Sequence, residues 1–448
     1  MRRGFIFDEA LCVSCKACSA ACILENGLQP GTRSLYAWND HALPLVSVIN
    51  LSMACNHCAE PACASGCPAL AYSVSPDGVV MHHPDLCMGC GYCTWRCPYD
   101  APKINPALGY IEKCHFCADR TAEGIEPACV TACPTGALKM TVREQFDDAL
   151  PAWFPETGIG PSLITRETAA KTRPVIIPAD SGEDEEEEEQ NRKAVPERIR
   201  KDWSLILFSM LVITASSLLI VSSFQSLTVA AIIPILLLTG AMAVSVIHLG
   251  KPGRSWRAFL NIISSPLSRE ILIVMLLAVV ALVHWIRPGL IPPFATVLIS
   301  VLTVISIDLV YFSTDRRTGL RLNAGQAFFT TLYAVSWFSA PRIIFIAFTM
   351  LAAFSIVMRY RSAERGSIER ILYYIRAMTI PLVLLLIYPE SPLADTAAMV
   401  LFLAGLAADR ILFYFDFNPP NIKDTIKEHF NTEYEKERDK QRQDPGLS

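Results

Sequence analysis

The sequence predicts two domains of different class in one chain, an α+β domain that binds metal clusters and an all-α polytopic membrane domain. All 16 cysteines of the 448-residue chain lie between Cys12 and Cys133. Apolar runs of about 20 residues, the length needed to cross a bilayer, begin only after Trp203. The composition is 52% hydrophobic with a formal net charge of -4, which excludes a basic nucleic-acid-binding protein and a disordered chain.

The cysteines fall into four groups of four. Cys12, Cys15, Cys18 and Cys22 are separated by two, two and three residues, and Cys87, Cys90, Cys93 and Cys97 repeat this spacing before Pro98. This is the spacing of bacterial ferredoxins, in which the fourth cysteine ligates a neighbouring cluster. The other two groups, with longer gaps before the third cysteine, are Cys55, Cys58, Cys63 and Cys67, and Cys114, Cys117, Cys129 and Cys133. Four complete groups predict four 4Fe-4S clusters.

Zinc knuckles and disulfides are the alternatives for such a dense set of cysteines. Zinc knuckles would need cysteine pairs a dozen or more residues apart, and disulfides an oxidising compartment. No apolar stretch or cleavage site precedes Cys12, and Arg2-Arg3 alone does not make a twin-arginine signal, so we expect no secretory signal. This favours thiolate ligands for iron. The histidines beside the cysteines are expected to surround the clusters without binding them; they are His57, His82, His83 and His115.

The four motifs resemble those of the four-cluster electron-transfer subunits of molybdenum bis-pterin respiratory enzymes, such as dimethyl sulfoxide, polysulfide and nitrate reductases and formate dehydrogenase. The resemblance covers residues 1 to 175. It implies a bis-ferredoxin-like fold of two paired modules with two 4Fe-4S clusters each, in which the first motif pairs with the fourth and the second with the third. In the nitrate reductase relative, a Trp at the position of Cys90 gives a three-iron cluster, so Cys90 here predicts a fourth cubane.

The same resemblance implies which cysteines share a cluster. The first ligand set is Cys12, Cys15, Cys18 and Cys133, and the second is Cys114, Cys117, Cys129 and Cys22. The third ligand set is Cys55, Cys58, Cys63 and Cys97, and the fourth is Cys87, Cys90, Cys93 and Cys67. Each motif therefore gives its last cysteine to the cluster of its partner.

A Pro-rich arm and an acidic linker are predicted to join the two domains. The cluster domain is assigned to residues 1–140, the arm and linker to 141–200, the membrane domain to 201–416 and a charged tail to 417–448. The acidic run Glu183–Glu189 reads as a solvated tether, because a block of like charges repels itself.

Eight apolar runs predict eight transmembrane helices. They are Trp203–Phe224, Leu227–Leu249, Ile271–Ile286, Leu290–Phe312, Leu322–Ser339, Ile343–Met358, Ile371–Tyr388 and Leu393–Tyr414. The fifth is the weakest because it contains Gln326, and the seventh contains Arg376 and Pro381.

The distribution of basic residues predicts the orientation, because short cytoplasmic loops retain Lys and Arg. The loops after the second, fourth and sixth runs contain Lys251, Arg254, Arg257, Arg269, Arg316, Arg317, Arg321, Arg359, Arg361, Arg365 and Arg370. The loops on the other side contain only Arg287 and Arg342. We therefore expect an inner-membrane protein with both termini and the clusters on the cytoplasmic side.

The loop after the second run carries a candidate quinone site. It begins with His248-Leu249-Gly250-Lys251-Pro252-Gly253-Arg254 and continues through Asn261 and Ser268 to Glu270. A quinone needs an apolar slot, hydrogen bonds to its carbonyls and a group that titrates near neutral pH, such as His248. The loop resembles the quinol-handling loop of the dimethyl sulfoxide reductase anchor, which implies that His248 and Glu270 act in menaquinol chemistry. Lys251, Arg254, Asn261 and Ser268 are expected nearby, although a helix-end histidine can also simply anchor at the interface.

A haem is not expected, because the only membrane histidines, His248 and His284, end successive antiparallel helices on opposite faces. The remaining charges at membrane depth are Asp308, Arg376, Asp409 and Arg410. They can pair with one another, line a proton path or lie at helix ends, and the sequence does not discriminate among these roles.

Together these features predict a fusion of an iron-sulfur subunit with a membrane anchor. It would relay electrons between a menaquinone or ubiquinone pool and a molybdenum or tungsten bis-pterin catalytic subunit, and carry no catalytic site besides the quinone site. Clusters on the cytoplasmic side favour an oxidising complex such as a sulfite dehydrogenase; dimethyl sulfoxide or polysulfide reduction is the runner-up. The alternative is a module that takes electrons from a flavoprotein or ferredoxin and moves ions, which would require more intramembrane carboxylates and lysines.

Overall fold

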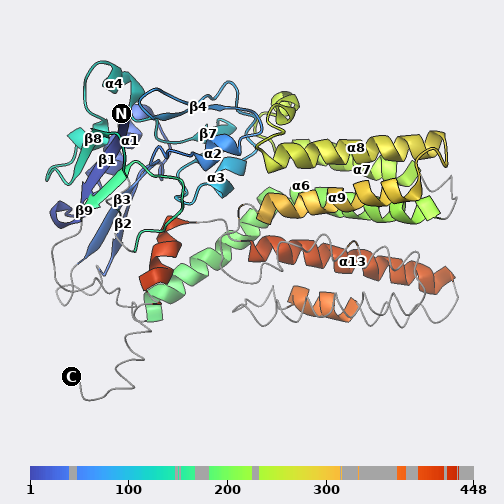
Figure 1. Cartoon of the computed structure of the whole chain (residues 1–448). Helices are drawn as coiled ribbons and strands as arrows, with labels where there is room; N and C mark the ends of the chain where they lie inside the picture. Colours follow the sequence, from blue (N-terminus) through green and yellow to red (C-terminus); the bar gives the residue numbers. More distant parts are fainter. Residues whose placement is uncertain are drawn as a thin grey trace, which may run out of the picture. The chain divides into compact units, whose positions relative to one another are not determined.

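The computed structural model describes most of the chain as two compact units. The described residues are 1–39, 48–146, 150, 153–166, 181–224, 232–312, 314, 331, 371–379, 392–417, 421–430 and 432. One unit comprises Met1–Glu188 with Pro419–Ser448, and the other comprises Glu189–Asn418. The elements of both are labelled in Figure 1.

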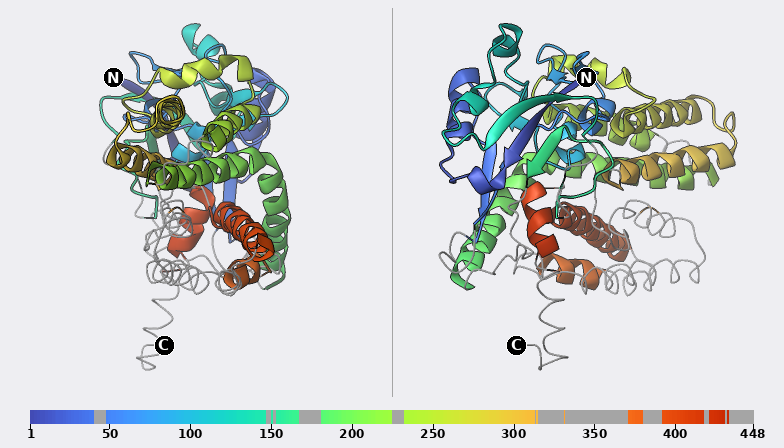
Figure 2. Two further views of the ribbon diagram at one scale, coloured as in Figure 1. Left: turned by 90° about the vertical axis from the view of Figure 1, so that its right-hand side faces the viewer. Right: turned by 60° about the vertical axis from the view of Figure 1, so that its left-hand side comes forward.

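A three-stranded sheet joins the two ends of the cysteine-rich region. Its central strand β1 (Arg2–Asp8) pairs antiparallel with β8 (Leu138–Arg143) and parallel with β9 (Leu163–Arg166). Phe5 and Phe7, two residues apart, are buried as the period of a strand requires. Phe7 lies opposite Leu138, so the residues that precede the first cysteine lie beside those that follow the last (Figure 2, right).

The rest of this unit consists of short hairpins and short helices around the cysteines. The hairpins are β2 (Ser34–Trp38) with β3 (Ile49–Met53), β4 (Tyr72–Val74) with β5 (Val80–His82), and β6 (Lys103–Asn105) with β7 (Tyr110–Glu112). The helices are η1 (Glu9–Leu11), α1 (Ala17–Asn26), α2 (Ala62–Ser65), α3 (Tyr92–Arg96), α4 (Ala118–Ala122) and α5 (Ala128–Thr131). The third cysteine of every motif is in a helix: Cys18 in α1, Cys63 in α2, Cys93 in α3 and Cys129 in α5.

The predicted boundary between cluster domain and arm, at residues 140 and 141, cuts through strand β8. Part of the arm belongs to the fold, because Trp153 and Phe154 are buried in the same core as Phe5 and Phe7. Strand β9 then completes the sheet. The prolines of the arm are compatible with this arrangement, since β9 is an edge strand of only four residues.

Within the predicted charged tail, residues 422–430 are helical and belong to the core of the first unit. Ile422, Ile426 and Phe430 are buried, and their spacing of four residues forms one apolar stripe on a helix. The ring of Phe430 lies 6.0 Å from that of Trp153. The charged residues between them concealed this stripe in the composition of the tail.

The second unit is helical and has the dimensions of a membrane domain. It contains α6 (Ser181–Phe224), α7 (Ile232–Ile247), η4 (Pro252–Phe259), α8 (Pro266–Ile286), α9 (Pro293–Phe312) and α13 (Pro392–Asp416). Among the described residues, three helical stretches are long and apolar enough to cross a bilayer: Asp202–Ser223, Pro266–Ile286 and Pro293–Phe312. A fourth span is possible if α7 and η4, bent by 114°, are counted together. Helix α8 contacts both α7 and α9, and the three run side by side (Figure 1).

Helices α6, α7, α8, α9 and α13 coincide with five of the eight predicted runs, but only those in α6, α8 and α9, or a fourth formed by α7 with η4, are candidate spans among the described residues. The runs at 322–339 and 343–358 lie outside the described residues almost entirely, and only residues 371–379 of the seventh are described, as a helix. The count of eight therefore stays a prediction. The acidic run Glu183–Glu189, expected as a solvated tether, is instead part of helix α6.

The close approach of β9 to β1 requires a glycine at position 4. A Cβ on Gly4 would lie 2.3 Å from the carbonyl oxygen of Ser162 and 2.5 Å from the ring of Phe146. We expect Gly4→Ala to displace β9 and to lower stability by about 1–3 kcal/mol. Thr141→Ala, across the β1–β8 ladder from Gly4, is the control and should cost less. Thermal unfolding of the purified variants measures this, and equal melting temperatures would contradict it.

Candidate functional site

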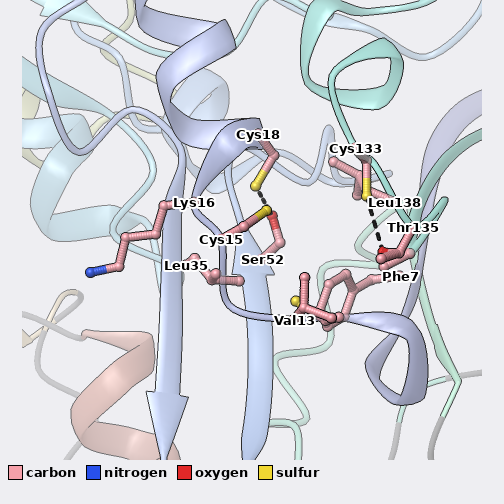
Figure 3. A pocket seen from close by; sticks show the side chains of 12 residues that line it. Phe7, Val13, Cys15, Lys16, Cys18, Leu35, Ser52, Cys133, Thr135 and Leu138 are labelled. Atoms are coloured by element: carbon pink, nitrogen blue, oxygen red, sulfur yellow. Dashed lines mark hydrogen bonds between the residues drawn. The ribbon is translucent and has the colours of Figure 1, made fainter.

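The four cysteines of the first ligand set line one hollow. Cys12, Cys15 and Cys18 come from the loop before α1 and its first turn, and Cys133 from the turn between α5 and β8. Ser52 lies 3.5 Å from the sulfur of Cys18, and Thr135 lies 3.8 Å from that of Cys133, as the dashed lines in Figure 3 show. The pairing of β1 with β8 brings these distant segments together.

The four cysteines of the second ligand set line a separate hollow. They are Cys22, Cys114, Cys117 and Cys129. The backbone amide of Phe116 donates to the sulfur of Cys114 at 3.4 Å, and the side-chain amide of Asn26 donates to that of Cys117 at 3.5 Å. Such N–H donors stabilise negative charge on sulfur.

The cysteines of the third and fourth ligand sets also lie beside the members of their own sets. The thiols whose charges act on Cys58 are those of Cys55, Cys97 and Cys63. Those that act on Cys90 are Cys67 and Cys87. Backbone amides again donate to sulfur, from Ala71 to Cys67 and from Gly89 to Cys87, each at 3.4 Å.

The buried thiols are suited to iron and unsuited to remaining free thiolates. Burial raises the pKa of Cys22 and of Cys97 to about 11 and that of Cys90 to about 12. Burial also raises the pKa of Cys58, Cys63 and Cys114. A coordinating metal deprotonates a thiol outright, and thiolate is the preferred ligand of iron-sulfur clusters. The sixteen cysteines therefore fit four clusters. Iron would keep their buried sulfurs in the thiolate form.

Zinc is a poorer match to this arrangement. Within the described part of the chain, no three His, Cys, Asp or Glu side chains meet closely enough to hold a single metal ion. A zinc site brings its four ligands within about 2.3 Å of one ion, whereas a cubane occupies the space between its cysteines. The two hollows lined by cysteines agree with the cubane.

His57 has a structural position in the core and is not at the surface. Its Nδ1 atom accepts a hydrogen bond of 3.0 Å from the amide of Val80, and its ring meets that of Phe116 at 5.3 Å. Burial and the positive charge of Lys113 hold the pKa of His57 well below its usual range, so the ring is neutral. Burial likewise lowers the pKa of His82 to about 4. His57 is thus fully buried and His82 half-buried, which the adjacency to cysteines alone could not reveal.

In the second unit, the proposed quinone residues lie around the joint between α7 and α8. His248 directly follows α7, and its Nδ1 atom is buried. Helix α8 begins at an N-cap, Ser265, whose side chain accepts from the amide of Ser268, with Pro266 in its first turn. Glu270 is also buried, just beyond the first turn of α8. Segment η4 contacts both helices.

The other predicted residues of this site differ in burial. Ser268 is fully buried and Asn261 is nearly so, with its side-chain oxygen accepting from the amide of Ser264 at 3.4 Å. Lys251 and Arg254 are half-buried at the start of η4. The polar side chains that could hold a quinone carbonyl are thus concentrated around the two ends of η4 and the start of α8.

Glu270 has neighbours from α9 and α13 that the sequence did not connect with it. The charges that act on its carboxyl belong to Arg410 and Asp308. Tyr311 and Tyr414 share a hydrogen bond between their hydroxyls and lie within the electrostatic range of Glu270. No local motif marks these tyrosines, because only the packing of α8, α9 and α13 brings them together.

Two of the remaining membrane charges are accounted for by pairing. The Nε atom of Arg376 lies 3.9 Å from a carboxylate oxygen of Asp409. Arg410 donates from Nε to Ser209 of α6 at 3.1 Å, and its guanidinium lies 4.9 Å from the ring of Phe413. Of the roles left open by the sequence, pairing therefore applies to Arg376 and Asp409.

Comparison with known proteins identifies the cysteine-rich part of the chain. A family model described as a 4Fe-4S dicluster domain matches residues 46–143. The chain is 43% identical over 140 residues to the B subunit of polysulfide reductase from Wolinella succinogenes, which is 30% of this chain and 73% of that relative. It is 39% identical over 149 residues to the B subunit of anaerobic dimethyl sulfoxide reductase from Escherichia coli, covering 30% and 71% of the two chains. The B subunit of tetrathionate reductase from Salmonella typhimurium is 33% identical over 177 residues, with coverages of 36% and 71%.

If iron holds the buried thiols, its removal should unfold the first unit. We expect chelation of iron under anoxic, reducing conditions to make residues 1–166 susceptible to protease, while the segments of α8 and α9 stay protected in detergent. The physical reason is that the short strands alone bury too little apolar surface, so that metal binding contributes to folding. Limited proteolysis with mass spectrometry measures this. Continued protection of residues 1–166 without iron would contradict the assignment.

Proposed function

Because this protein belongs, through its cysteine-rich part, to the family of the iron-sulfur B subunits of dimethyl sulfoxide and polysulfide reductases, we propose that it is the electron-transfer and quinone-binding subunit of a respiratory molybdenum or tungsten bis-pterin oxidoreductase. The observation that carries the proposal is the pair of hollows, each lined by four cysteines that come from opposite ends of the cysteine-rich region. A purely structural membrane anchor would not need cysteines from distant parts of the sequence to meet in this way.

The proposed relay follows from the adjacency of the ligand sets. Cys18 and Cys22, one helical turn apart on α1, would connect the first cluster to the second. Cys114 and Cys55 act on each other electrostatically and would connect the second to the third. Cys93 and Cys63 would connect the third to the fourth in the same manner. When bound, the 4Fe-4S clusters would supply one-electron transfer. The four ligand sets would hold them, and burial of most of these cysteines would exclude water.

Quinone chemistry is proposed at the joint of α7 and α8. His248 and Glu270 would hold and move the protons of the quinone, while Asn261, Ser268, Lys251 and Arg254 would orient its carbonyls. The position of His248 supports this role, because an ionisable side chain with a buried ring nitrogen at the end of a membrane helix is a candidate functional residue.

We further propose that the chain is a natural fusion of iron-sulfur subunit and eight-helix membrane anchor in the inner membrane, with the clusters on the cytoplasmic side. The charge of the loops supports that orientation. A cytoplasmic donor side favours oxidation of a substrate such as sulfite with reduction of the quinone. Reduction of dimethyl sulfoxide or polysulfide is the second candidate, and the names of the relatives favour it.

Isolation of the complex tests the assignment of partner and reaction. We expect purification in mild detergent, through a tag after Ser448, to yield about sixteen irons, one molybdenum or tungsten and a large pterin-binding subunit. Metal analysis and mass spectrometry of the co-eluting proteins measure this. Sixteen irons with a flavoprotein and no molybdenum or tungsten would retain the clusters but overturn the proposed partner.

The quinone site is tested by exchange of its two titratable residues. We expect His248→Ala and Glu270→Gln each to lower quinone-dependent turnover by about 10²-fold or more, because each removes a proton-transfer group. The electron paramagnetic resonance signals of the clusters should not change. His284→Ala is the matched control, since His284 is a buried histidine at the far end of α8. Normal quinone kinetics in His248→Ala would remove that residue from the site.

A further inference from the structure

Among the described residues of the cysteine-rich unit, two cationic side chains are buried, and neither belongs to a predicted ligand set. The residues are Arg33, which is 2% exposed, and Lys113, which is 4% exposed. Within the described part of the chain, no carboxylate lies within ion-pair distance of either side chain. Glu112, the sequence neighbour of Lys113, accepts instead from the amide of Gln29 and the side chain of Asn105. A buried charge without a counterion is unfavourable, so these two require another source of negative charge.

Lys113 is fixed by all three of its N–H donors. Its Nζ atom donates to the carbonyl oxygens of Val80 at 2.6 Å and of Cys114 at 2.8 Å. The third contact is with the sulfur of Cys55 at 3.5 Å. An ammonium group has three donors and no acceptor. This geometry therefore places the charge next to the sulfur of Cys55, in the third ligand set, and next to the backbone of Cys114, in the second.

Arg33 is held from one side only. Its Nη1 atom donates to Ser52 at 3.0 Å, and its guanidinium lies 4.7 Å from the ring of Phe5. The Nε and Nη2 atoms are buried and have no hydrogen-bond partner among the described residues. The groups whose charges act on Arg33 are four cysteines: Cys129, Cys114, Cys18 and Cys22. Its unsatisfied donors therefore lie in a region surrounded by cysteine sulfur.

Each cation lies between two neighbouring ligand sets. Arg33 is near Cys18 of the first set and near three cysteines of the second. Lys113 is near Cys55 and Cys63 of the third set and near Cys114 of the second. The corresponding position between the third and fourth sets is occupied by the buried phenol of Tyr72, which is near Cys63, Cys93 and Cys67 and is neutral. Two of the three junctions of the proposed relay thus contain a fixed positive charge.

We propose that Arg33 and Lys113 are positioning residues of the electron relay, each holding a positive charge between two adjacent clusters and raising the reduction potentials of both. The inference rests on the proposed function, since it requires the clusters. A cluster bound by four thiolates is anionic, and reduction adds one further negative charge. A nearby cation stabilises the reduced form more than the oxidised form, and burial weakens the screening of that attraction. A carboxylate partner would cancel this effect, whereas carbonyl and hydroxyl partners leave the positive charge effective.

Redox titration of the whole complex, followed by electron paramagnetic resonance, tests the proposal. We expect Arg33→Gln to lower the potentials of the clusters of the first and second sets, and Lys113→Gln those of the second and third. The expected change is at least tenfold in the reduction equilibrium, equivalent to about 59 mV for a one-electron couple. The cluster of the fourth set, beside neutral Tyr72, should move least in both variants.

Three further variants separate charge from structure. Arg33→Lys and Lys113→Arg retain the charge and should leave the potentials within half of the shift seen in the glutamine variants. Lys16→Gln removes a cation next to Cys15 that is exposed to solvent, and screening should make its effect small. Iron is measured in every variant, so that only preparations with the wild-type iron content are compared.

The outcomes separate the two proposals. Unchanged potentials in iron-replete glutamine variants would overturn the role of the cations, as would equal shifts in the charge-retaining variants. Loss of iron from the glutamine variants, with retention in Arg33→Lys and Lys113→Arg, would assign the cations to cluster assembly and also overturn the role in potential. An iron content below four clusters in the wild-type complex would instead contradict the proposed function itself.

Discussion

The burial of thiols is the constraint on which the first unit depends. Most of its cysteines are buried, although the strands around them are only three to seven residues long. A buried thiol retains its proton unless a metal replaces it, as the raised pKa values of Cys22, Cys90 and Cys97 indicate. Iron would therefore provide what a larger apolar core provides in other domains. A chain wrapped around clusters explains the short hairpins and the residues in the left-handed conformation, such as Lys16 and Cys117. It also explains why the described elements around the cysteines include no long helix.

The central position of β1 brings together the cysteines of the proposed relay. Because β1 pairs with β8, the loop that contains Cys12 meets the turn that contains Cys133. Because α1 carries both Cys18 and Cys22, the same helix contributes to two hollows. The order of the cysteines in the sequence and the pairing of β1 with β8, which are distant in the sequence, are therefore sufficient for the proposed electron path.

The sequence predicted the cysteine groups and the apolar runs because both are local patterns. Spacing of two and three residues defines a turn around a cluster, and a run of about 20 apolar residues defines a span. Arg33 and Lys113 could not be predicted in this way, since their positions near several cysteines arise only from the folded hairpins. The helix at 422–430 could have been found from the spacing of Ile422, Ile426 and Phe430, but the charged composition of the tail concealed it. Trp153 and Phe154 were missed for a similar reason, because the surrounding prolines indicated an arm.

Arg376, on the one hand, and Arg33 and Lys113, on the other, are buried cations in two different electrostatic settings. Arg376 in the membrane unit lies beside a carboxylate, Asp409, and the pair is neutral overall, so its field outside the pair is small. Its contribution is to fix the neighbouring helix segments relative to one another, and removal of one partner leaves the other charge uncompensated. Arg33 and Lys113 have no carboxylate among the described residues at ion-pair distance, so their fields extend to whatever lies in the adjacent hollows. A buried cation with a counterion is therefore a structural feature, whereas a buried cation without one indicates that an anion belongs nearby, and in this unit the thiolate-bound clusters are the anions that the cysteines can hold.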